Sequence, residues 1–155
     1  AILPKLLERT GTNESGTITG IYTVLVDGDD MNEPIADTVR GILDGHFVLD
    51  RDLANKGQYP AINILKSVSR LMSQLASPAH KKAAEKIREQ LSTYLNSEDL
   101  INIGAYKPGA SKEIDEAIER YPKIVSFIKQ STDETCSMES SIRALIGLAE
   151  TGEWA

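Results

Sequence analysis

The spacing of apolar residues changes near the middle of the chain. Up to Met72, short apolar runs alternate with segments of helical periodicity, and from Ser77 onward nearly every segment has helical periodicity. Apolar residues that recur every three or four positions mark one face of a helix, whereas short β-branched runs mark strands. The sequence therefore predicts an α/β part over residues 1–75 and an all-α part over residues 76–155.

Three segments of the first part predict strands. Residues 17–26 read TITGIYTVLV, whose apolar side chains fall on both faces, as in a strand that helices cover on both sides. HFVLD and AINIL predict two further short strands. Between the strands, a helix begins at Pro34 and a brief one is closed by Gly57. This alternation favours an α/β sheet.

Serine residues mark where the helices of the second part begin. Ser77 precedes Pro78 as a helix cap, and Ser111 caps another helix, which Pro122 should kink or end. A last helix follows the polar segment STDETCS, with apolar residues recurring from Met138. These segments predict a helical bundle.

Composition excludes some classes of function. The 155 residues carry a formal net charge of -6, which disfavours a surface for nucleic acid or anionic membrane. No apolar run is long enough to span a bilayer, and Cys136, the single cysteine, fits a reducing cytosolic setting. The chain begins directly in AILPKLLERTG, without an initiator methionine, and we therefore expect it to come from a longer protein.

Several patterns suggest chemistry that the residues do not support. The loop GAYKPGAS, residues 104–111, has the glycine spacing of a phosphate-binding loop, but it lacks the lysine and the following serine or threonine. A structural turn is the better interpretation. His46 and His80 have no ligand-like spacing, so no metal site is predicted. The acidic turn that contains Asp27, Asp29 and Asp30 lacks the spacing of a calcium loop.

Tyr59 and Arg70 flank the third predicted strand, in the stretch YPAINILKSVSR. An aromatic residue before proline is usually a packing residue, and a single arginine is usually solvated. The alternative is a nucleotide site shared between two subunits, with the aromatic ring and the guanidinium contacting nucleotides. Residue chemistry alone leaves both interpretations open.

Several sequence blocks resemble one family strongly. GDDMNEPIAD, ILDGHFVL, YPAI and SVSR are similar to the ATPases of the bacterial flagellar and type III secretion export apparatus, which are related to the catalytic subunit of rotary ATP synthases. IGAYKPG favours the export branch. The resemblance covers the chain well up to about Tyr121. It implies the C-terminal remnant of a RecA-like P-loop ATPase sheet, followed by a C-terminal helical domain.

The resemblance also implies what this chain lacks. In that family the phosphate-binding loop, the catalytic glutamate and the magnesium-binding aspartate lie upstream of the segment that matches AILPKLLERTG. The full-length enzyme would use ATP and Mg²⁺, and this chain alone should not hydrolyse ATP. The resemblance further implies that Tyr59 stacks on the adenine and that Arg70 is an arginine finger for a neighbouring subunit, which requires a homo-hexamer.

Partners and location are implied in the same way. The family contacts a coiled-coil stalk protein, export chaperones and export substrates, and associates peripherally with a membrane export gate at the cytoplasmic face. One helix carries possible contacts for such partners at Glu85, Arg88 and Glu89, which could equally form a solvated helix face. The acidic turn that contains Asp29 and Asp30 is a possible subunit-interface loop. Alternative interpretations are an injectisome ATPase, a rotary ATP synthase subunit, a helical protein-interaction module, and a RecA-like nucleic-acid motor, which the acidic balance disfavours.

Overall fold

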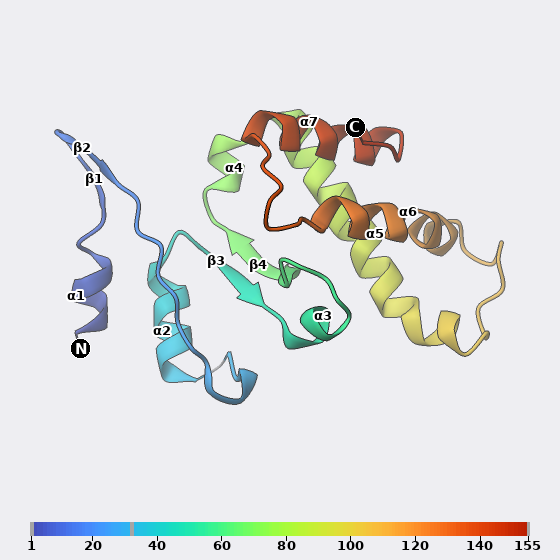
Figure 1. Ribbon diagram of the computed structural model, residues 1–155, viewed down its shortest axis with the longest axis horizontal. Helices are drawn as coiled ribbons and strands as arrows, with labels where there is room; N and C mark the ends of the chain where they lie inside the picture. The colour runs from blue at the N-terminus through green and yellow to red at the C-terminus, as the bar shows by residue number, and fades with distance from the viewer. Residues whose placement is uncertain (1, 32, 155) are drawn as a thin grey trace. The chain divides into compact units, whose positions relative to one another are not determined.

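The computed structural model describes residues 2–31 and 33–154, without the side chain of Asp29 (Figure 1). The chain divides into two compact units, residues 1–46 and residues 47–155. The second unit contains most of the helices and both residues for which the sequence suggests a nucleotide role.

The first unit consists of short elements. Gly11–Asn13 (β1) and Gly16–Ile18 (β2) form an antiparallel hairpin, whose turn is stabilised by the Asn13 side chain accepting hydrogen bonds from the N–H groups of Ser15 and Gly16. Leu3–Leu7 (α1) contacts Pro34–Ile42 (α2), and Asp27–Asp29 forms a short 3₁₀ helix (η1). Helix α2 begins at Pro34 as predicted, and Ala36 and Val39 are its buried residues.

The predicted strand over residues 17–26 is wrong for most of its length. Only Thr17 and Ile18 belong to a strand, and residues 19–26 have no regular strand structure. Ile21 and Leu25 are 93% and 91% exposed. A strand is stabilised by hydrogen bonds to a neighbouring strand, and no described residues of this chain supply one beside residues 19–26.

The other two predicted strands are present and pair with each other. Gly45–Leu49 (β3) pairs with Ile62–Ser69 (β4), and Arg51–Asn55 (α3) lies between them in sequence. β4 is longer than the predicted strand and is bent. The Ser67 hydroxyl donates to the Asn63 carbonyl at 2.6 Å, although residues four apart in a straight strand are roughly 13 Å apart.

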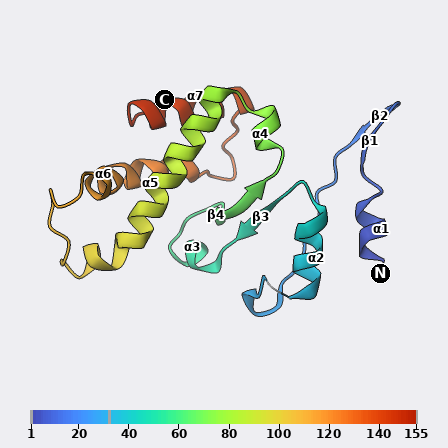
Figure 2. The same ribbon diagram turned by 180° about the vertical axis from the view of Figure 1, so that it is seen from behind.

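The other helices of the second unit follow β4 in the sequence (Figure 2). They are α4 (Met72–Leu75), α5 (Pro78–Asn102), α6 (Lys112–Ile128) and α7 (Met138–Glu150). Ser77 and Ser111 cap α5 and α6 as predicted, because their hydroxyls accept hydrogen bonds from the N–H groups of His80 and Ile114.

Pro122 lies inside α6 and does not end it, contrary to one of the two outcomes predicted. An internal proline costs about 3 kcal/mol because it removes a helical hydrogen bond. Ala117 and Ile124, on either side of it, are fully buried. Packing of this face therefore outweighs the local penalty.

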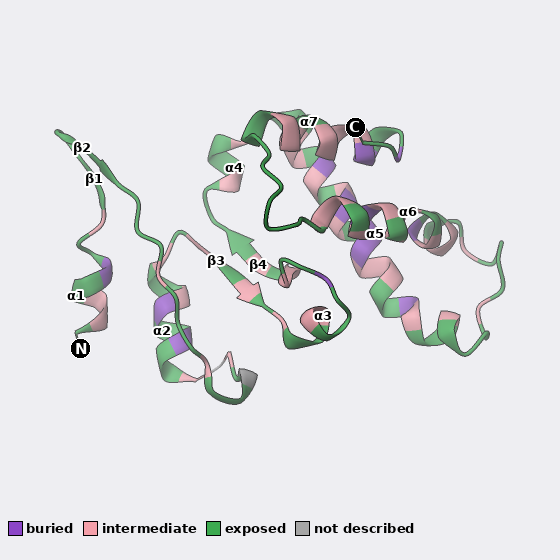
Figure 3. Ribbon diagram, viewed as in Figure 1, coloured by how far each residue is buried: buried purple, intermediate pink, exposed green. Residues whose placement is uncertain are grey.

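The core lies between α5, α6 and α7, where the buried residues gather in Figure 3. Ile87 and Leu91 of α5 pack in one cluster with Ile124 of α6 and Leu148 of α7. Tyr94 and Tyr121 stack between α5 and α6, with ring centroids 3.6 Å apart and planes inclined by 8°. Burial raises the pKa of Tyr121, and the nearby Glu98 carboxylate adds to this effect.

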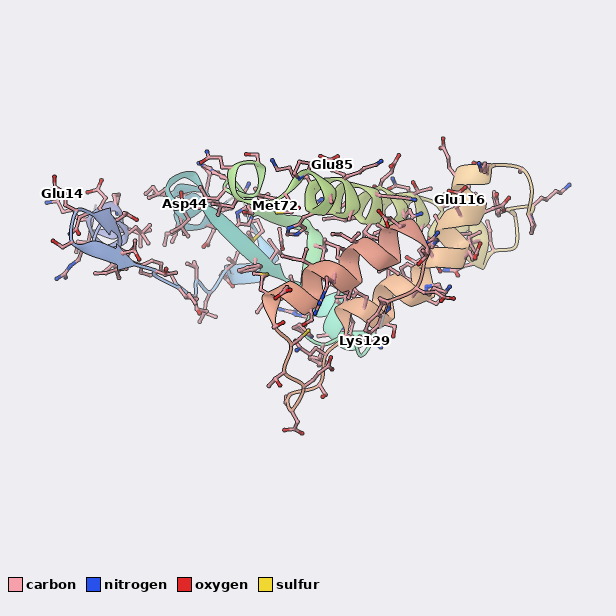
Figure 4. The ribbon with its side chains drawn as sticks, turned by 90° about the horizontal axis from the view of Figure 1, so that it is seen from above. Glu14, Asp44, Met72, Glu85, Glu116 and Lys129 are labelled. Carbon is pink, nitrogen blue, oxygen red and sulfur yellow. The ribbon has the colours of Figure 1, made fainter. Side chains whose placement is uncertain are left out.

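Arg88 connects this helical core to the sheet. Its guanidinium donates to the carbonyls of Ile64 at 2.5 Å and Leu65 at 3.2 Å, both on β4. The sequence suggested that Arg88 contacts a partner protein or belongs to a solvated helix face. The interpretation as a solvated helix face is wrong for Arg88, because the side chain is half-buried and hydrogen-bonded within the unit. Glu85 and Glu89 are exposed, and Figure 4 shows Glu85 on the side of α5 turned away from α7.

Replacement of Arg88 by methionine tests this connection. Arg88→Met keeps an extended side chain but removes the donors to two β4 carbonyls. We expect the free energy of unfolding to fall by about 1–3 kcal/mol, measured by urea denaturation followed by circular dichroism. Glu89→Gln, on the next residue, is the control and should change stability by less than about 0.5 kcal/mol. Equal stability of the two variants would contradict the assigned role.

Candidate functional site

Tyr59 lies in the loop between α3 and β4, which hydrogen bonds fix at several points. Gly57 has a φ of +70°, which L-residues with a Cβ rarely adopt, and the N–H of Gln58 donates to the carbonyl of Leu53 at 2.9 Å. The carbonyl of Tyr59 accepts a hydrogen bond from the N–H of Gln130 at 2.9 Å, and the bond to Pro60 is cis. The loop is therefore tied to the C-terminal end of α6. The Tyr59 side chain is 59% exposed.

Asp50 organises the other side of this loop. Its carboxylate accepts hydrogen bonds from the Asn63 amide at 2.8 Å, the N–H of Asp52 at 3.0 Å and the Lys66 ammonium at 3.1 Å. Its own N–H donates to the carbonyl of Ala61 at 2.9 Å. The Asp50 side chain thus caps α3 and holds the start of the bent strand, and its backbone N–H fixes the chain two residues after Tyr59.

These contacts shift the titration of Asp50. The hydrogen bond from Asn63, aided by Lys66 and by the N–H of Asp52, holds the pKa of this carboxyl below its ordinary value of 3.8, against the opposing effect of burial. The folded state therefore favours the ionised form of Asp50.

An open hollow of about 490 Å³ lies beside Tyr59. This volume is within the range typical of small-ligand sites. Figure 4 marks Lys129 at the end of α6, where the loop to α7 begins. The hollow is lined by residues of the α3–β4 loop, the end of α6, the α6–α7 loop and the C-terminal tail. These residues are Gly57, Tyr59, Ser126, Lys129, Gln130, Ser131, Glu134 and Trp154.

The far wall of the hollow was not predicted from the sequence. Gln130 donates from its side-chain amide to the carbonyl of Glu134 at 3.1 Å, and the Glu134 carboxylate accepts from the N–H of Ser131 at 3.3 Å. These bonds organise the start of the α6–α7 loop. The only sequence signal is the polar segment STDETCS, which indicates a loop but not what the loop approaches.

A second, smaller crevice lies between β4 and the helices. Its volume is about 40 Å³, and apolar side chains such as Leu53, Leu91 and Tyr121 form much of its lining. This space is small and lined mostly by core side chains, and we assign it to core packing.

Arg70 lies at the other end of β4, directly after Ser69 and before α4 (Figure 1). Its side chain is exposed and does not line the hollow beside Tyr59. The structure therefore places the two sequence-predicted residues at opposite ends of one strand. It does not bring them together around one hollow.

The loop of residues 104–111 is a turn between α5 and α6, as the sequence indicated. Gly104 and Gly109 have φ values of +69° and +88°. The Asp115 carboxylate accepts hydrogen bonds from the N–H of Gly109 at 2.8 Å and the hydroxyl of Tyr106 at 2.9 Å. A carboxylate that occupies a loop N–H group in this way opposes phosphate binding by charge repulsion.

Other features of the described residues supply no site. The acidic turn around Asp27 and Asp30 forms η1, whose end is closed by the N–H of Asp30 donating to the Asp27 carbonyl at 3.1 Å, and the Asp29 side chain lies outside the described residues. Within residues 2–31 and 33–154, no group of three acidic, histidine or cysteine side chains could hold a metal ion. In the same residues, no helix is long and apolar enough to cross a membrane.

Comparison with protein families matches both parts of the chain. Residues 1–69 match the ATP synthase alpha/beta family, nucleotide-binding domain. Residues 76–147 match the T3SS EscN ATPase C-terminal domain. Only residues 70–75 and 148–155 lie outside these two matches.

Individual relatives agree with the family matches. The chain is 69% identical over 153 residues to the flagellum-specific ATP synthase of Bacillus subtilis and 51% identical over 143 residues to the SPI-2 type 3 secretion system ATPase of Salmonella typhimurium. These alignments cover 99% and 92% of this chain. The chain spans only about a third of the length of either relative, 35% and 33%.

Solved structures show the same fold. The assembled ATPase EscN of the enteropathogenic E. coli type III secretion system superposes with a TM-score of 0.92 at 46% identity, over 96% of this chain and 36% of that one. EscN in complex with its central stalk EscO superposes with a TM-score of 0.85 at 44% identity, over 96% and 35% of the two chains.

The pKa of Asp50 gives a testable dependence of stability on pH. A carboxyl with a lowered pKa in the folded state stabilises the fold above its ordinary value of 3.8, and loses this contribution as the pH falls through the lowered pKa. We therefore expect Asp50→Asn to lower the free energy of unfolding by about 1–2 kcal/mol at pH 7. The deficit should shrink as the pH falls below 3.8.

Urea denaturation of both proteins between pH 7 and pH 3 measures this difference. Glu85→Gln, which removes an exposed carboxylate from α5, is the control for charge removal and should cost less than about 0.5 kcal/mol at pH 7. A deficit for Asp50→Asn that stays constant down to pH 3 would show that charge on Asp50 is not what stabilises the loop.

Proposed function

This chain belongs to the family of flagellar and type III secretion ATPases, and we propose that it supplies two functional side chains to such an enzyme. Tyr59 provides a platform for the adenine of ATP bound to its own subunit. Arg70 stabilises the charge that develops on ATP bound to a neighbouring subunit. The observation that supports this proposal is the placement of the two side chains at opposite ends of β4.

The surroundings of Tyr59 suit a nucleobase. The ring is largely exposed although the backbone on both sides of it is fixed by hydrogen bonds, so little ordering is needed when a ligand binds. Aromatic rings stack on flat bases, and removal of such a ring costs about 1–3 kcal/mol of binding. The polar groups of Gln130, Ser131 and Lys129 border the same hollow and can meet the edge of a base.

The position of Arg70 suits action across a subunit interface. Because Arg70 does not line the hollow beside Tyr59, it serves a different nucleotide from the one that Tyr59 contacts. A planar guanidinium matches the charge spread over the γ-phosphate oxygens during transfer. Hydrolysis then requires an assembled ring, and we propose a homo-hexamer.

Other parts of the reaction belong outside this chain. ATP and Mg²⁺ require a phosphate cradle and carboxylate ligands, and the sequence contains no G-x-x-x-x-G-K-[ST] loop. We propose that an upstream part of the full-length protein supplies them. Mg²⁺ neutralises the phosphate charge when bound, while Tyr59 holds the base and Arg70 supplies positive charge from the next subunit.

We assign the full-length protein to flagellar export rather than to an injectisome. The identity of 69% to the flagellum-specific ATP synthase of Bacillus subtilis, against 51% to the secretion ATPase of Salmonella typhimurium, favours this choice. On this proposal the protein works at the cytoplasmic face of the membrane, beside the export gate, and receives export substrates and chaperones.

A coiled-coil stalk is the partner that the solved relatives support best, because EscN has been solved in complex with its central stalk EscO. In this chain, the Arg88 guanidinium already donates to two carbonyls of β4. Leu100 and Ile103 are 50% and 75% exposed where α5 ends, and they offer an apolar contact to a stalk helix. We propose the end of α5 as the stalk contact.

Substitution of Tyr59 tests the adenine platform. In the full-length enzyme, Tyr59→Ala should raise the dissociation constant for ATP roughly 5- to 150-fold, because the stacking contact is lost. Tyr59→Phe should retain most of the affinity, because it keeps the ring. Titration calorimetry measures both. Unchanged affinity in Tyr59→Ala would rule out the platform.

Substitution of Arg70 tests action on a neighbouring subunit. Arg70→Ala should lower kcat by on the order of 10³-fold or more and leave ATP affinity nearly unchanged, because the charge acts in the transition state. Lysine should rescue poorly, since it lacks the planar fork. The measurements are steady-state ATPase kinetics and ATP binding by calorimetry.

Mixed rings provide the decisive control. A chain with a disabled phosphate-binding loop but intact Arg70, mixed with Arg70→Ala chains, should recover part of the activity, because some interfaces combine the two intact parts. If mixing recovers nothing, or if Arg70→Ala weakens ATP binding and spares the rate, Arg70 is not a finger that acts between subunits.

A further inference from the structure

The C-terminal tail folds back beside the end of α7. The N–H of Thr151 donates to the carbonyl of Gly147 at 2.9 Å, and the N–H of Gly152 donates to the carbonyl of Leu148 at 3.1 Å. The Thr151 hydroxyl then accepts from the N–H of Glu153 at 3.3 Å. These bonds give residues 151–154 a defined path immediately after the last helix.

Two glycines and one arginine make this path possible. Gly152 is buried, has a φ of +80°, and leaves no room for a Cβ, which would overlap the Arg120 guanidinium. That guanidinium, on α6, donates to the carbonyl of Leu148 at 2.6 Å. A Cβ on Gly147 would lie 2.9 Å from the carbonyl oxygen of Glu153. The tail is therefore held by close backbone approach to α7 and by the Arg120 side chain of α6.

This path places Trp154 at the hollow beside Tyr59. The indole packs edge to face on Phe127 of α6, with ring centroids 5.5 Å apart and planes inclined by 77°. Trp154 remains 40% exposed and lines the hollow together with Tyr59 and Gln130. A tryptophan that served only to pack on Phe127 would not need to face an open hollow. Because a ligand in the hollow would cover the exposed part of the indole, burial of this apolar surface would favour binding.

We propose that Trp154 is a second aromatic contact for the base of the nucleotide, in addition to Tyr59. This proposal rests on the proposed function of the hollow. The ligand class is a nucleoside triphosphate, whose planar base offers apolar surface to both rings while its edge meets the polar groups of the α6–α7 loop. The match to the C-terminal family domain covers residues 76–147, and Trp154 lies after it in the sequence.

The experiment compares ATP with inorganic tripolyphosphate in the full-length protein, by titration calorimetry. Tripolyphosphate carries the phosphate charges but has no base. Trp154→Ala should weaken ATP binding about tenfold and leave tripolyphosphate binding unchanged, because only the base contacts the indole. Trp154→Phe should retain most of the ATP affinity. Met138→Ala is the matched control, because Met138 is 76% exposed on α7 and does not line the hollow.

Tryptophan fluorescence provides a second measurement of the Trp154 contact, and it needs only the variant Trp154→Phe. The difference in emission between the parent protein and Trp154→Phe isolates the signal of Trp154, whatever other tryptophans the full-length protein contains. ATP should change this difference and tripolyphosphate should not. Gly152→Ala should act like Trp154→Ala, because it displaces the tail.

The outcomes separate this inference from the proposed function. If Tyr59→Ala weakens ATP binding and Trp154→Ala does not, the Trp154 contact is wrong and the adenine platform stands. If neither variant changes ATP binding, both are wrong. If Trp154→Ala lowers the melting temperature without a selective loss of ATP affinity, or if the fluorescence difference ignores ATP, Trp154 is only a packing residue.

Discussion

Arg88 makes the interaction on which the arrangement of the second unit depends. Two neighbouring carbonyls of β4 accept hydrogen bonds from one guanidinium on α5, and a buried carbonyl without a donor would cost about 1–3 kcal/mol. The guanidinium is itself fixed, because α5 packs through Ile87 and Leu91 into the core with α6 and α7. A strand with few strand neighbours is thereby attached to a well-packed helical bundle.

The position of β4 determines where both functional side chains emerge. Before the strand, Tyr59 is tied to the end of α6 through Gln130 and to the start of α3 through the contacts of Asp50. After the strand, Arg70 leaves in the opposite direction, toward α4. One strand presents an aromatic ring at one end and a cation at the other. This layout is the basis for the proposal that the two side chains contact nucleotides of different subunits.

The sequence predicted elements best where local chemistry defines them. Ser77 and Ser111 start helices because their hydroxyls cap free N–H groups, and those helices begin where they were predicted. The strand over residues 17–26 was wrong because its apolar pattern does not provide a neighbouring strand, and Ile21 and Leu25 stay exposed. Pro122 was expected to kink or end α6, and the second of these outcomes is wrong, because the core contacts around Pro122 keep the helix continuous.

The site was only partly predictable, because most of its contacts join segments that are far apart in the sequence. Tyr59 and Arg70 stood out through their resemblance to a family, whereas Arg88 was taken for a surface residue because helical spacing alone does not show a carbonyl acceptor. Trp154 lies 95 residues after Tyr59 in the sequence, and only the turn at Gly152 places it at the hollow. Contacts between distant segments require the folded structure.

The central claim is that Tyr59 and Arg70 serve nucleotides of different subunits. The most direct test is an experimental structure of the assembled full-length protein with Mg²⁺ and a non-hydrolysable ATP analogue. We expect the Tyr59 ring on the adenine of its own subunit and the Arg70 guanidinium at the γ-phosphate bound to the next subunit. Both side chains on one nucleotide, or Arg70 directed away from every nucleotide, would contradict it.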